Sequence, residues 1–164
     1  FERGDRWFNT GDLLKRDDEG DYWFVDRLGD TFRWKGENIS TEEVNLVLSK
    51  LDWLACSTVY GVKVPDQEGR VGMVAVELRE GAEFDAAELY KWLESQLPKA
   101  AIPRFVRIVD SLDTTGSFKF LKHSLQKEGF ESQTSDDPVW AWAPKKSTYV
   151  PYESSLRNRV LKSL

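Results

Sequence analysis

The side chains that could do chemistry in this sequence are a carboxylate, a guanidinium and an ammonium, at Asp12, Arg27 and Lys119. Asp12 follows a Thr-Gly pair, and an ionised carboxylate accepts hydrogen bonds from paired hydroxyl groups. Arg27 follows an apolar run, and its planar guanidinium suits pairs of oxygen atoms. Lys119 lies in segment 114–122, and a compact ammonium stabilises charge where two anions approach each other.

The same residues also have purely structural explanations. An aspartate after glycine in a β-rich segment is usually a turn former. Arg27 could form a surface ion pair with Asp26 or Asp30, and a lysine at the start of a helix is usually solvated. Lys122 is a second candidate for the ammonium in the same segment. The residue types alone therefore leave both explanations open.

Nucleophilic and metal chemistry have little support, because the chain has one cysteine and one histidine. Cys56 lies in the apolar run 53–60, which is typical of a small buried thiol, and no His or Asn is close in sequence to act as its partner. His123 is expected on the exposed side of a helix. We therefore predict no zinc site and no other metal ligand set in this chain.

Composition indicates an ordinary soluble domain. The 164 residues are enough for one domain with its own core, and the net charge of −5 with 31% charged residues gives no broad basic face for nucleic acid. A single cysteine excludes an internal disulfide framework and suits a reducing, intracellular compartment. No apolar run approaches the roughly 18 residues of a membrane span, and no signal peptide is visible.

Three zones separate along the chain. Residues 1–28 are predicted to form short strands, with a turn at 17–20, and such a hairpin needs another surface to pack on. Residues 29–128 have the alternating pattern of a compact α+β unit. Residues 129–164 begin with a polar segment, but their later aromatic residues indicate docking on a neighbouring surface.

Capping signals locate two helices in the middle zone. Ser40 and Glu43 form a capping box, and Asp85 precedes a second helix that Pro98 ends. Strands are predicted at 31–34, 54–64, 71–79 and 105–109, and a final helix at 120–126. The core positions expected on the two capped helices and just beyond the first are Val44, Leu48, Leu51, Leu89, Trp92 and Leu93.

Four motifs, in this order, carry a family resemblance. They are Phe8 to Asp12, Asp26 to Asp30, Lys35 to Asn38 and Thr114 to Lys122. Their order and separations resemble the nucleotide-binding, hinge and terminal motifs of the adenylate-forming enzymes, which include acyl-CoA synthetases, firefly luciferase and peptide-synthetase adenylation domains. Within that superfamily, segment 30–38 is most similar to the fatty acid transport proteins, also called very long-chain acyl-CoA synthetases. The resemblance covers about residues 5–128.

The resemblance implies a domain organisation. Residues 1–28 would be the last strands of a large N-terminal adenylation domain, residues 29–128 a C-terminal lid domain, and residues 129–164 an aromatic-containing extension. The lid is expected to be an α+β domain with a three-stranded sheet, two main helices and an entrance β-hairpin. The family's phosphate-gripping loop would lie upstream, so we expect the chain alone to be inactive and to bind ATP poorly.

The implied function is that of an ATP-dependent long-chain or very long-chain fatty acyl-CoA synthetase, working through an acyl-adenylate. ATP, CoA and Mg²⁺ would be bound mainly by the large domain, with the fatty acid and CoA as substrates and that domain as the lid's partner. The resemblance admits membrane association of the full-length protein, at the cytoplasmic face of the endoplasmic reticulum or the peroxisome. The alternatives are another adenylate-forming ligase, acting on a non-fatty acid, and a noncatalytic interaction module.

The resemblance also implies roles for single residues before the hinge and within it. Asp12 would bind the ribose hydroxyls of ATP, and Arg27 the ribose or the phosphate end of the nucleotide. The lid would rotate between the two half-reactions about Gly29 and Asp30, where glycine accepts the widest range of backbone angles. A turn glycine without any motion is the alternative at Gly29.

Beyond the hinge, the implied roles concern CoA and the first chemical step. Gly36 would leave room for the pantetheine arm of CoA, and Asn38 would lie on the side of the CoA phosphates, although a plain tight turn would look similar. Lys119 would be catalytic, bridging the fatty acid carboxylate and the ATP α-phosphate. Phe118 stands before it where most relatives have glycine.

Overall fold

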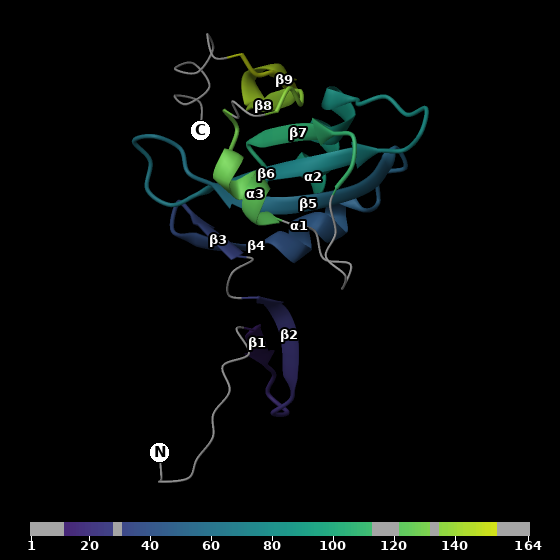
Figure 1. Cartoon of the computed structure of the whole chain (residues 1–164). Coiled ribbons are helices and arrows are strands. Elements are labelled where there is room, and N and C mark those ends of the chain that lie inside the picture. Colours follow the sequence, from purple (N-terminus) through teal and green to yellow (C-terminus); the bar gives the residue numbers. More distant parts are fainter. Residues whose placement is uncertain (1–11, 28–30, 113–121, 132–134, 154–164) are drawn as a thin grey trace.

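A computed structural model of the chain describes residues 12–27, 31–112, 122–131 and 135–153 (Figure 1). Within these ranges the chain forms nine strands, three α-helices and one short 3-10 helix, in an α+β arrangement. Among the described helices, none combines the length and the apolar character needed to cross a membrane. The α+β class predicted from the sequence is confirmed.

The first two strands form the predicted hairpin. Strand β1 (Asp12–Arg16) pairs antiparallel with β2 (Tyr22–Arg27), and Figure 1 shows this hairpin apart from the main body. At its tip the Asp17 carboxylate accepts hydrogen bonds from the Trp23 indole at 2.7 Å and the Asp21 amide at 2.8 Å. These bonds, the indole first, lower the pKa of Asp17 below its ordinary value.

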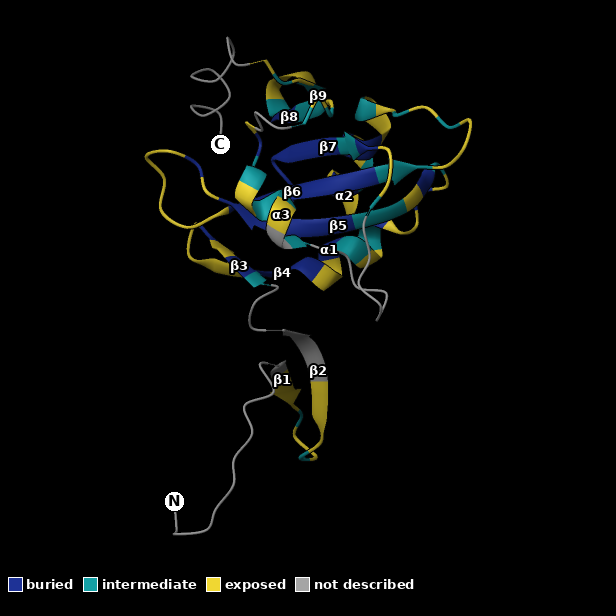
Figure 2. Cartoon of the chain, in the orientation of Figure 1, coloured by how far each residue is buried: buried dark blue, intermediate teal, exposed yellow. Residues whose placement is uncertain are grey.

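Apolar side chains of this hairpin face solvent. Tyr22, Trp23 and Leu14 are 66%, 62% and 49% exposed, and Figure 2 shows exposed residues along the described part of the hairpin. Neighbouring residues of a strand point to opposite faces, so Tyr22 and Leu14 share one face of the hairpin and Trp23 lies on the other. The hairpin has the turn that the sequence predicts, and each of its faces carries at least one large, exposed apolar side chain.

A five-stranded sheet forms the centre of the main body. Its strands in spatial order are β5 (Leu54–Val62), β6 (Val71–Leu78), β7 (Phe105–Val109), β8 (Val139–Ala143) and β9 (Thr148–Pro151). Only the β6–β7 pair is parallel, and helix α2 (Ala86–Gln96) lies in the connection between these two strands. The three strands expected for the lid are present as β5, β6 and β7.

The extension docks by joining this sheet. Strand β8 pairs antiparallel with β7, β9 pairs with β8, and the 3-10 helix Pro144–Lys146 connects them. The Tyr149 hydroxyl, which is buried, donates a hydrogen bond of 2.7 Å to the carbonyl oxygen of Pro103, just before β7. The extension therefore adds two strands to the sheet of residues 29–128, for which three strands were predicted.

The two capped helices form as predicted. Helix α1 (Thr41–Leu48) begins after Ser40, whose hydroxyl accepts from the Glu43 amide at 3.3 Å, and the Asp85 carboxylate accepts from two amides at the start of α2. Of the six predicted core residues, five are at most 6% exposed, as the following list shows: Val44, Leu48, Leu51, Leu89 and Leu93. Figure 2 shows the same concentration of buried residues along β5, β6 and β7.

Trp92 differs from the prediction because it is only half-buried. Its indole nitrogen donates a hydrogen bond of 2.9 Å to the carbonyl oxygen of Val47, in the last turn of α1. The last carbonyls of a helix lack partners within the helix, so this bond satisfies one of them. Trp92 thus links α2 to α1 at the border of the core.

An entrance hairpin precedes α1. Strand β3 (Thr31–Trp34) pairs with β4 (Glu37–Ser40), which confirms the expected entrance β-hairpin; the sequence pattern located only its first strand. Phe32 packs this hairpin onto the sheet, since a Cβ added to either of two facing glycines, Gly61 in β5 or Gly72 in β6, would lie within 3 Å of the Phe32 side chain.

A second contact fixes the same hairpin. The Arg70 amide donates a hydrogen bond of 2.8 Å to the carbonyl oxygen of Arg33, and Gly69 forms a bridge with Trp34. Gly69 has φ +87°, and an added Cβ would lie 2.3 Å from the Arg33 carbonyl oxygen. Gly36, in the β3–β4 turn, has the same φ of +87° but open space around its missing Cβ.

These two glycines allow a matched test of the packing. Gly36→Ala should destabilise the protein by roughly 1–2 kcal/mol, the usual cost of a left-handed backbone for an L-residue. Gly69→Ala should cost about 1–3 kcal/mol more, because it adds an overpacking clash to the same strain. Urea unfolding of both variants measures the difference, and equal losses would show that the 65–70 loop does not constrain β3.

Candidate functional site

The two predicted nucleotide-binding residues stand opposite each other. Asp12 and Arg27 are Cα partners at the open end of the β1–β2 hairpin, with Leu13 and Asp26 as the next pair. Only their backbone positions lie within the described structure. Residues 15 apart in the chain are thus brought to one place by the turn at Asp17, as a shared ligand would require.

The predicted CoA-side residues occupy the β3–β4 turn. Lys35 and Gly36 form a two-residue turn with φ values of 50° and 87°, and Asn38 pairs with Arg33 across the hairpin. Such a turn requires positive φ at both central positions, which explains the glycine without any ligand. The space beside Gly36 is open, so the turn also leaves room for a narrow group to pass.

Three predicted residues, Gly29, Asp30 and Lys119, lie outside the described residues, but the structure shows how the segment with Lys119 is flanked. Before it, the Leu112 amide donates a hydrogen bond of 2.9 Å to a Glu77 carboxylate oxygen. After it, helix α3 (Lys122–Glu128) overlaps the predicted final helix, which was placed at residues 120–126.

Lys122, the second candidate for the ammonium, has a partner within the same domain. Its Nζ donates a hydrogen bond of 3.2 Å to the Thr41 hydroxyl, at the first residue of α1. This bond ties the start of α3 to the start of α1. The contact gives Lys122 a structural role within the domain. His123 follows in α3, with its side chain outside the described part.

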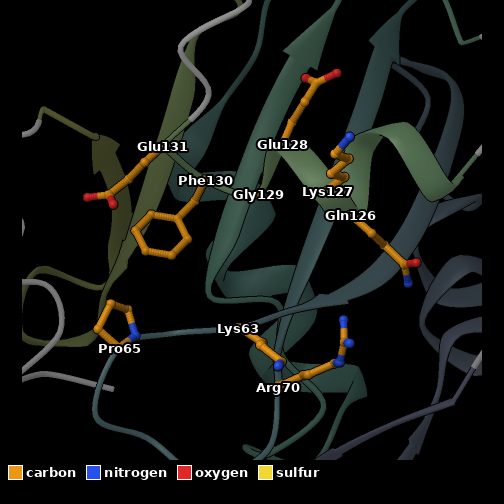
Figure 3. A pocket seen from close by; sticks show the side chains of 9 residues that line it. All are labelled: Lys63, Pro65, Arg70, Gln126, Lys127, Glu128, Gly129, Phe130 and Glu131. Carbon is orange, nitrogen blue, oxygen red and sulfur yellow. The ribbon is translucent and has the colours of Figure 1, made fainter.

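A surface hollow of about 570 Å³ lies between the C-terminal end of α3 and the loop that joins β5 to β6. The loop contributes the cations Lys63 and Arg70, whereas the end of α3 and the residues after it contribute Lys127, Glu128 and Glu131 (Figure 3). In this view Lys127 and Glu128 point away from Lys63 and Arg70, so the cations do not converge. The charges that line the hollow are of both signs, so they do not select an anion.

Cys56 corrects one prediction, because the thiol is half-buried in β5 instead of fully buried. Its Sγ lies 3.3 Å from a Glu77 carboxylate oxygen. Burial, with the adjacent Glu77 carboxylate, raises the pKa of the thiol to about 12. A thiol with so high a pKa is almost entirely protonated near neutral pH, which agrees with the expectation that Cys56 is not a nucleophile.

Sequence reasoning missed two buried arginines. Arg104 is 2% exposed; its Nη2 donates a hydrogen bond of 2.8 Å to the Lys99 carbonyl oxygen, and its guanidinium carbon lies 3.6 Å from the centre of the Trp142 ring. Burial lowers the pKa of Arg104 to about 10. The second, Arg107, is fully buried in β7 and donates to Glu128 at 2.7 Å. No local signal marks either one, because the side chains that contact them are distant in sequence: Trp142 for Arg104, and Glu128 and Asp137 for Arg107.

A metal site finds no support in the described ranges, where no three histidine, cysteine or acidic side chains cluster so as to hold an ion. The chemistry that the described geometry can serve is therefore that of its charged and backbone groups. These are a carboxylate and a guanidinium position at one hairpin end, an open glycine turn, and a segment with Lys119 that begins and ends at anchored residues.

Comparison with known proteins matches residues 43–119 to the family described as the AMP-binding enzyme C-terminal domain. Long-chain fatty acid transport protein 5 of Mus musculus is 52% identical over 89% of this chain and 21% of its own length. A medium/long-chain-fatty-acid–CoA ligase of Mycobacterium tuberculosis is 45% identical over 93% of this chain and 25% of its own. The chain thus spans about a quarter of these relatives.

Among solved structures, the O-succinylbenzoate coenzyme A synthetase of Bacillus subtilis, in complex with AMP, is similar with a TM-score of 0.66 and 31% identity. The similarity covers 77% of this chain and 25% of that enzyme. The same enzyme has been solved with its acyl-adenylate intermediate and with ATP and a magnesium ion. The fold described above is that of the C-terminal part of such enzymes.

The environment of Cys56 predicts a slow thiol. A rise of its pKa to about 12 should make alkylation of the folded protein by iodoacetamide at pH 8 roughly 10³-fold slower than that of an ordinary cysteine, since only the thiolate reacts. Glu77→Gln should speed the reaction by removing the adjacent negative charge. A Cys56 that reacts at the rate of a free thiol would contradict the described packing.

Proposed function

Because residues 43–119 match the family described as the AMP-binding enzyme C-terminal domain, we propose that the full-length protein is an ATP-dependent fatty acyl-CoA synthetase. The observation that carries the proposal is the 52% and 45% identity to a fatty acid transport protein and a fatty-acid–CoA ligase, over nine-tenths of the chain. The enzyme joins a long-chain or very long-chain fatty acid to CoA, first forming an acyl-adenylate and then the thioester.

The cofactors follow from the same family. Adenylate-forming relatives are known with AMP, and with ATP and magnesium, so the proposed enzyme uses ATP and Mg²⁺ in the first half-reaction. CoA enters in the second. A large N-terminal adenylation domain binds most of these groups, and the chain described here supplies the residues that close over them.

The domain arrangement is part of the proposal. Residues 1–28 are the last strands of the large domain, residues 29–128 are the lid, and residues 129–164 are the extension. The exposed Tyr22, Trp23 and Leu14 support the first assignment, since an isolated two-stranded hairpin with large exposed apolar side chains is marginal in water without a larger domain beside it. We also propose that the full-length protein is located at the cytoplasmic face of the endoplasmic reticulum or peroxisomal membrane.

In the first half-reaction, Asp12 accepts hydrogen bonds from the ribose hydroxyls, and Arg27 binds the ribose or phosphate oxygens. The opposition of the two backbone positions in the β1–β2 hairpin supports this shared role. Lys119 is the catalytic residue, whose ammonium screens the repulsion between the fatty acid carboxylate and the α-phosphate. The hydrogen bond of Lys122 to Thr41 supports Lys119 as the residue that reaches the large domain.

In the second half-reaction, the lid rotates about Gly29 and Asp30, which removes Lys119 and presents the β3–β4 turn. The pantetheine arm of CoA then passes Gly36, with Asn38 on the phosphate side. Open space beside the missing Cβ of Gly36 supports this passage.

A noncatalytic interaction module, which would use the tryptophans of the extension to bind a partner, receives less support. Trp142 is 4% exposed and stacks on Arg104, and Trp140 packs against Phe84 with ring centres 5.1 Å apart. Both rings are engaged within the chain itself. The second alternative is a ligase that acts on a non-fatty acid. In this family the large domain holds the pocket for the acid, so an assay of the full-length protein with fatty and non-fatty acids distinguishes the two ligases.

The hinge assignment predicts an asymmetric defect. Gly29→Pro in the full-length protein fixes one backbone angle and hinders the rotation. If the adenylating pose is the one retained, thioester formation should fall more than adenylation. Separate measurement of the two half-reactions tests this, and equal losses in both would leave the hinge elsewhere.

The assignment of Lys119 predicts a defect confined to the first step. Lys119→Ala in the full-length protein should slow acyl-adenylate formation by about 10² to 10³-fold, the usual scale for removing one preorganised charge-stabilising group. Conversion of pre-formed acyl-adenylate with CoA should stay near the wild-type rate, because the lid has by then carried this residue away.

Lys122→Ala is the matched control for register. It removes one hydrogen bond to Thr41 and should slow adenylation by less than about tenfold. Rapid-quench measurement of both half-reactions in both variants decides between them. If Lys122→Ala carries the large adenylation defect, the register is wrong; if neither variant does, the proposed catalytic role of this segment fails.

A further inference from the structure

One face of β7 holds the end of α3. Phe105 and Arg107 are two residues apart in β7, so their side chains point to the same side of the sheet. Phe105 stacks on Phe130, two residues beyond α3, with ring centres 4.2 Å apart and planes 7° from parallel. Arg107 contacts Glu128, the last residue of the helix. The strand therefore binds α3 at its C-terminal end by one stacking contact and one ion pair.

The two carboxylates near Arg107 are not equivalent. Its Nη1 lies 2.7 Å from a Glu128 oxygen, within hydrogen-bond distance, whereas its Nε lies 3.8 Å from an Asp137 oxygen. Among the described residues, Nε and Nη2 of Arg107 have no hydrogen-bond partner. A charge buried without water is held firmly where it has a close partner, so Glu128 is the contact that fixes this guanidinium.

Glu128 fixes the C-terminal end of α3, and the hydrogen bond from Lys122 to Thr41 fixes its start. Helix α3 has seven residues and is therefore about 10 Å long. It begins at Lys122, three residues after Lys119 in the chain. Because the helix is short and rigid, a shift at its C-terminal end also displaces its first residue, Lys122. Small displacements of this size matter, because misplacing a catalytic group by about 1 Å can cost about 10² in rate.

Resting on the proposed role of Lys119, we propose that Arg107 is a positioning residue for the adenylation half-reaction, acting through Glu128 and α3. Arg107 touches no substrate. Its buried guanidinium fixes the end of the helix that follows Lys119, so that the ammonium reaches the developing charge at the right place. Asp137, on the extension side of the same guanidinium, provides no comparable constraint on α3.

The test uses the full-length protein and separates the two half-reactions. Glu128→Gln keeps the shape of the side chain and removes its charge, and it should slow acyl-adenylate formation at least fivefold. Conversion of pre-formed acyl-adenylate with CoA should stay within twofold of wild type. Asp137→Asn is the matched control, since it removes the other carboxylate near Arg107; it should leave both half-reactions within twofold of wild type.

A double variant shows whether the effect passes through Lys119. If it does, Lys119→Ala with Glu128→Gln should be no slower in adenylation than Lys119→Ala alone. Arg107→Lys, which keeps a cation, should retain more adenylation than Arg107→Met. The melting temperature of each variant shows whether it folds. If Arg107→Met does not fold, the result for Glu128→Gln decides the test.

Three results would overturn the proposal. Equal losses in both half-reactions for Glu128→Gln would show that the pair only stabilises the fold, and losses that add in the double variant would show that it acts apart from Lys119. Wild-type adenylation by Glu128→Gln would show that the pair does not matter to this step. Wild-type adenylation by Lys119→Ala is a separate result that removes the proposed function of Lys119 itself.

Discussion

The burial of β7 between β6 and β8 is the constraint on which much of this structure depends. Arg107 in this strand and Arg104 just before it are both buried, and a buried charge is stable only where other groups replace its hydration. Arg107 receives the carboxylates of Glu128 and Asp137, whereas Arg104 receives a backbone carbonyl and the face of Trp142. Two of these groups, Trp142 and Asp137, belong to the extension, so this segment is part of the core of the domain.

The same sheet fixes the segments that are proposed to act in different half-reactions. Phe32 seats the entrance hairpin on Gly61 and Gly72, at one end of β5 and β6. On the other side of the proposed exchange, the Leu112 amide is bonded to Glu77 of β6, where the Lys119 segment begins. A rotation that exchanges one segment for the other can therefore move the domain as a rigid body, without rearranging its interior.

Local signals made much of this fold predictable. The caps at Ser40 and Asp85 act within one turn of their own helices, so both helices could be placed from the sequence. The pairing of β8 with β7 could not be predicted, because the two strands lie some 30 residues apart in the sequence. An aromatic strand does not indicate which other strand it will pair with. The burial of Arg104 depends on that distant packing, and Cys56 lies beside Glu77 of the neighbouring strand β6. At the candidate site, motif order indicated Asp12, Arg27 and Gly36, whereas the contact of Arg107 with Glu128 had no sequence signal.

The place of β8 and β9 also sets a limit on when the domain can become complete during its synthesis. β7 is made well before β8, and until β8 emerges from the ribosome one side of β7 has no strand beside it. In that interval the guanidiniums of Arg104 and Arg107 remain hydrated, and the β7 edge is open to pairing with another chain. A nascent chain that stalls between these two strands would therefore present a ready surface to chaperones, which the last strands later conceal.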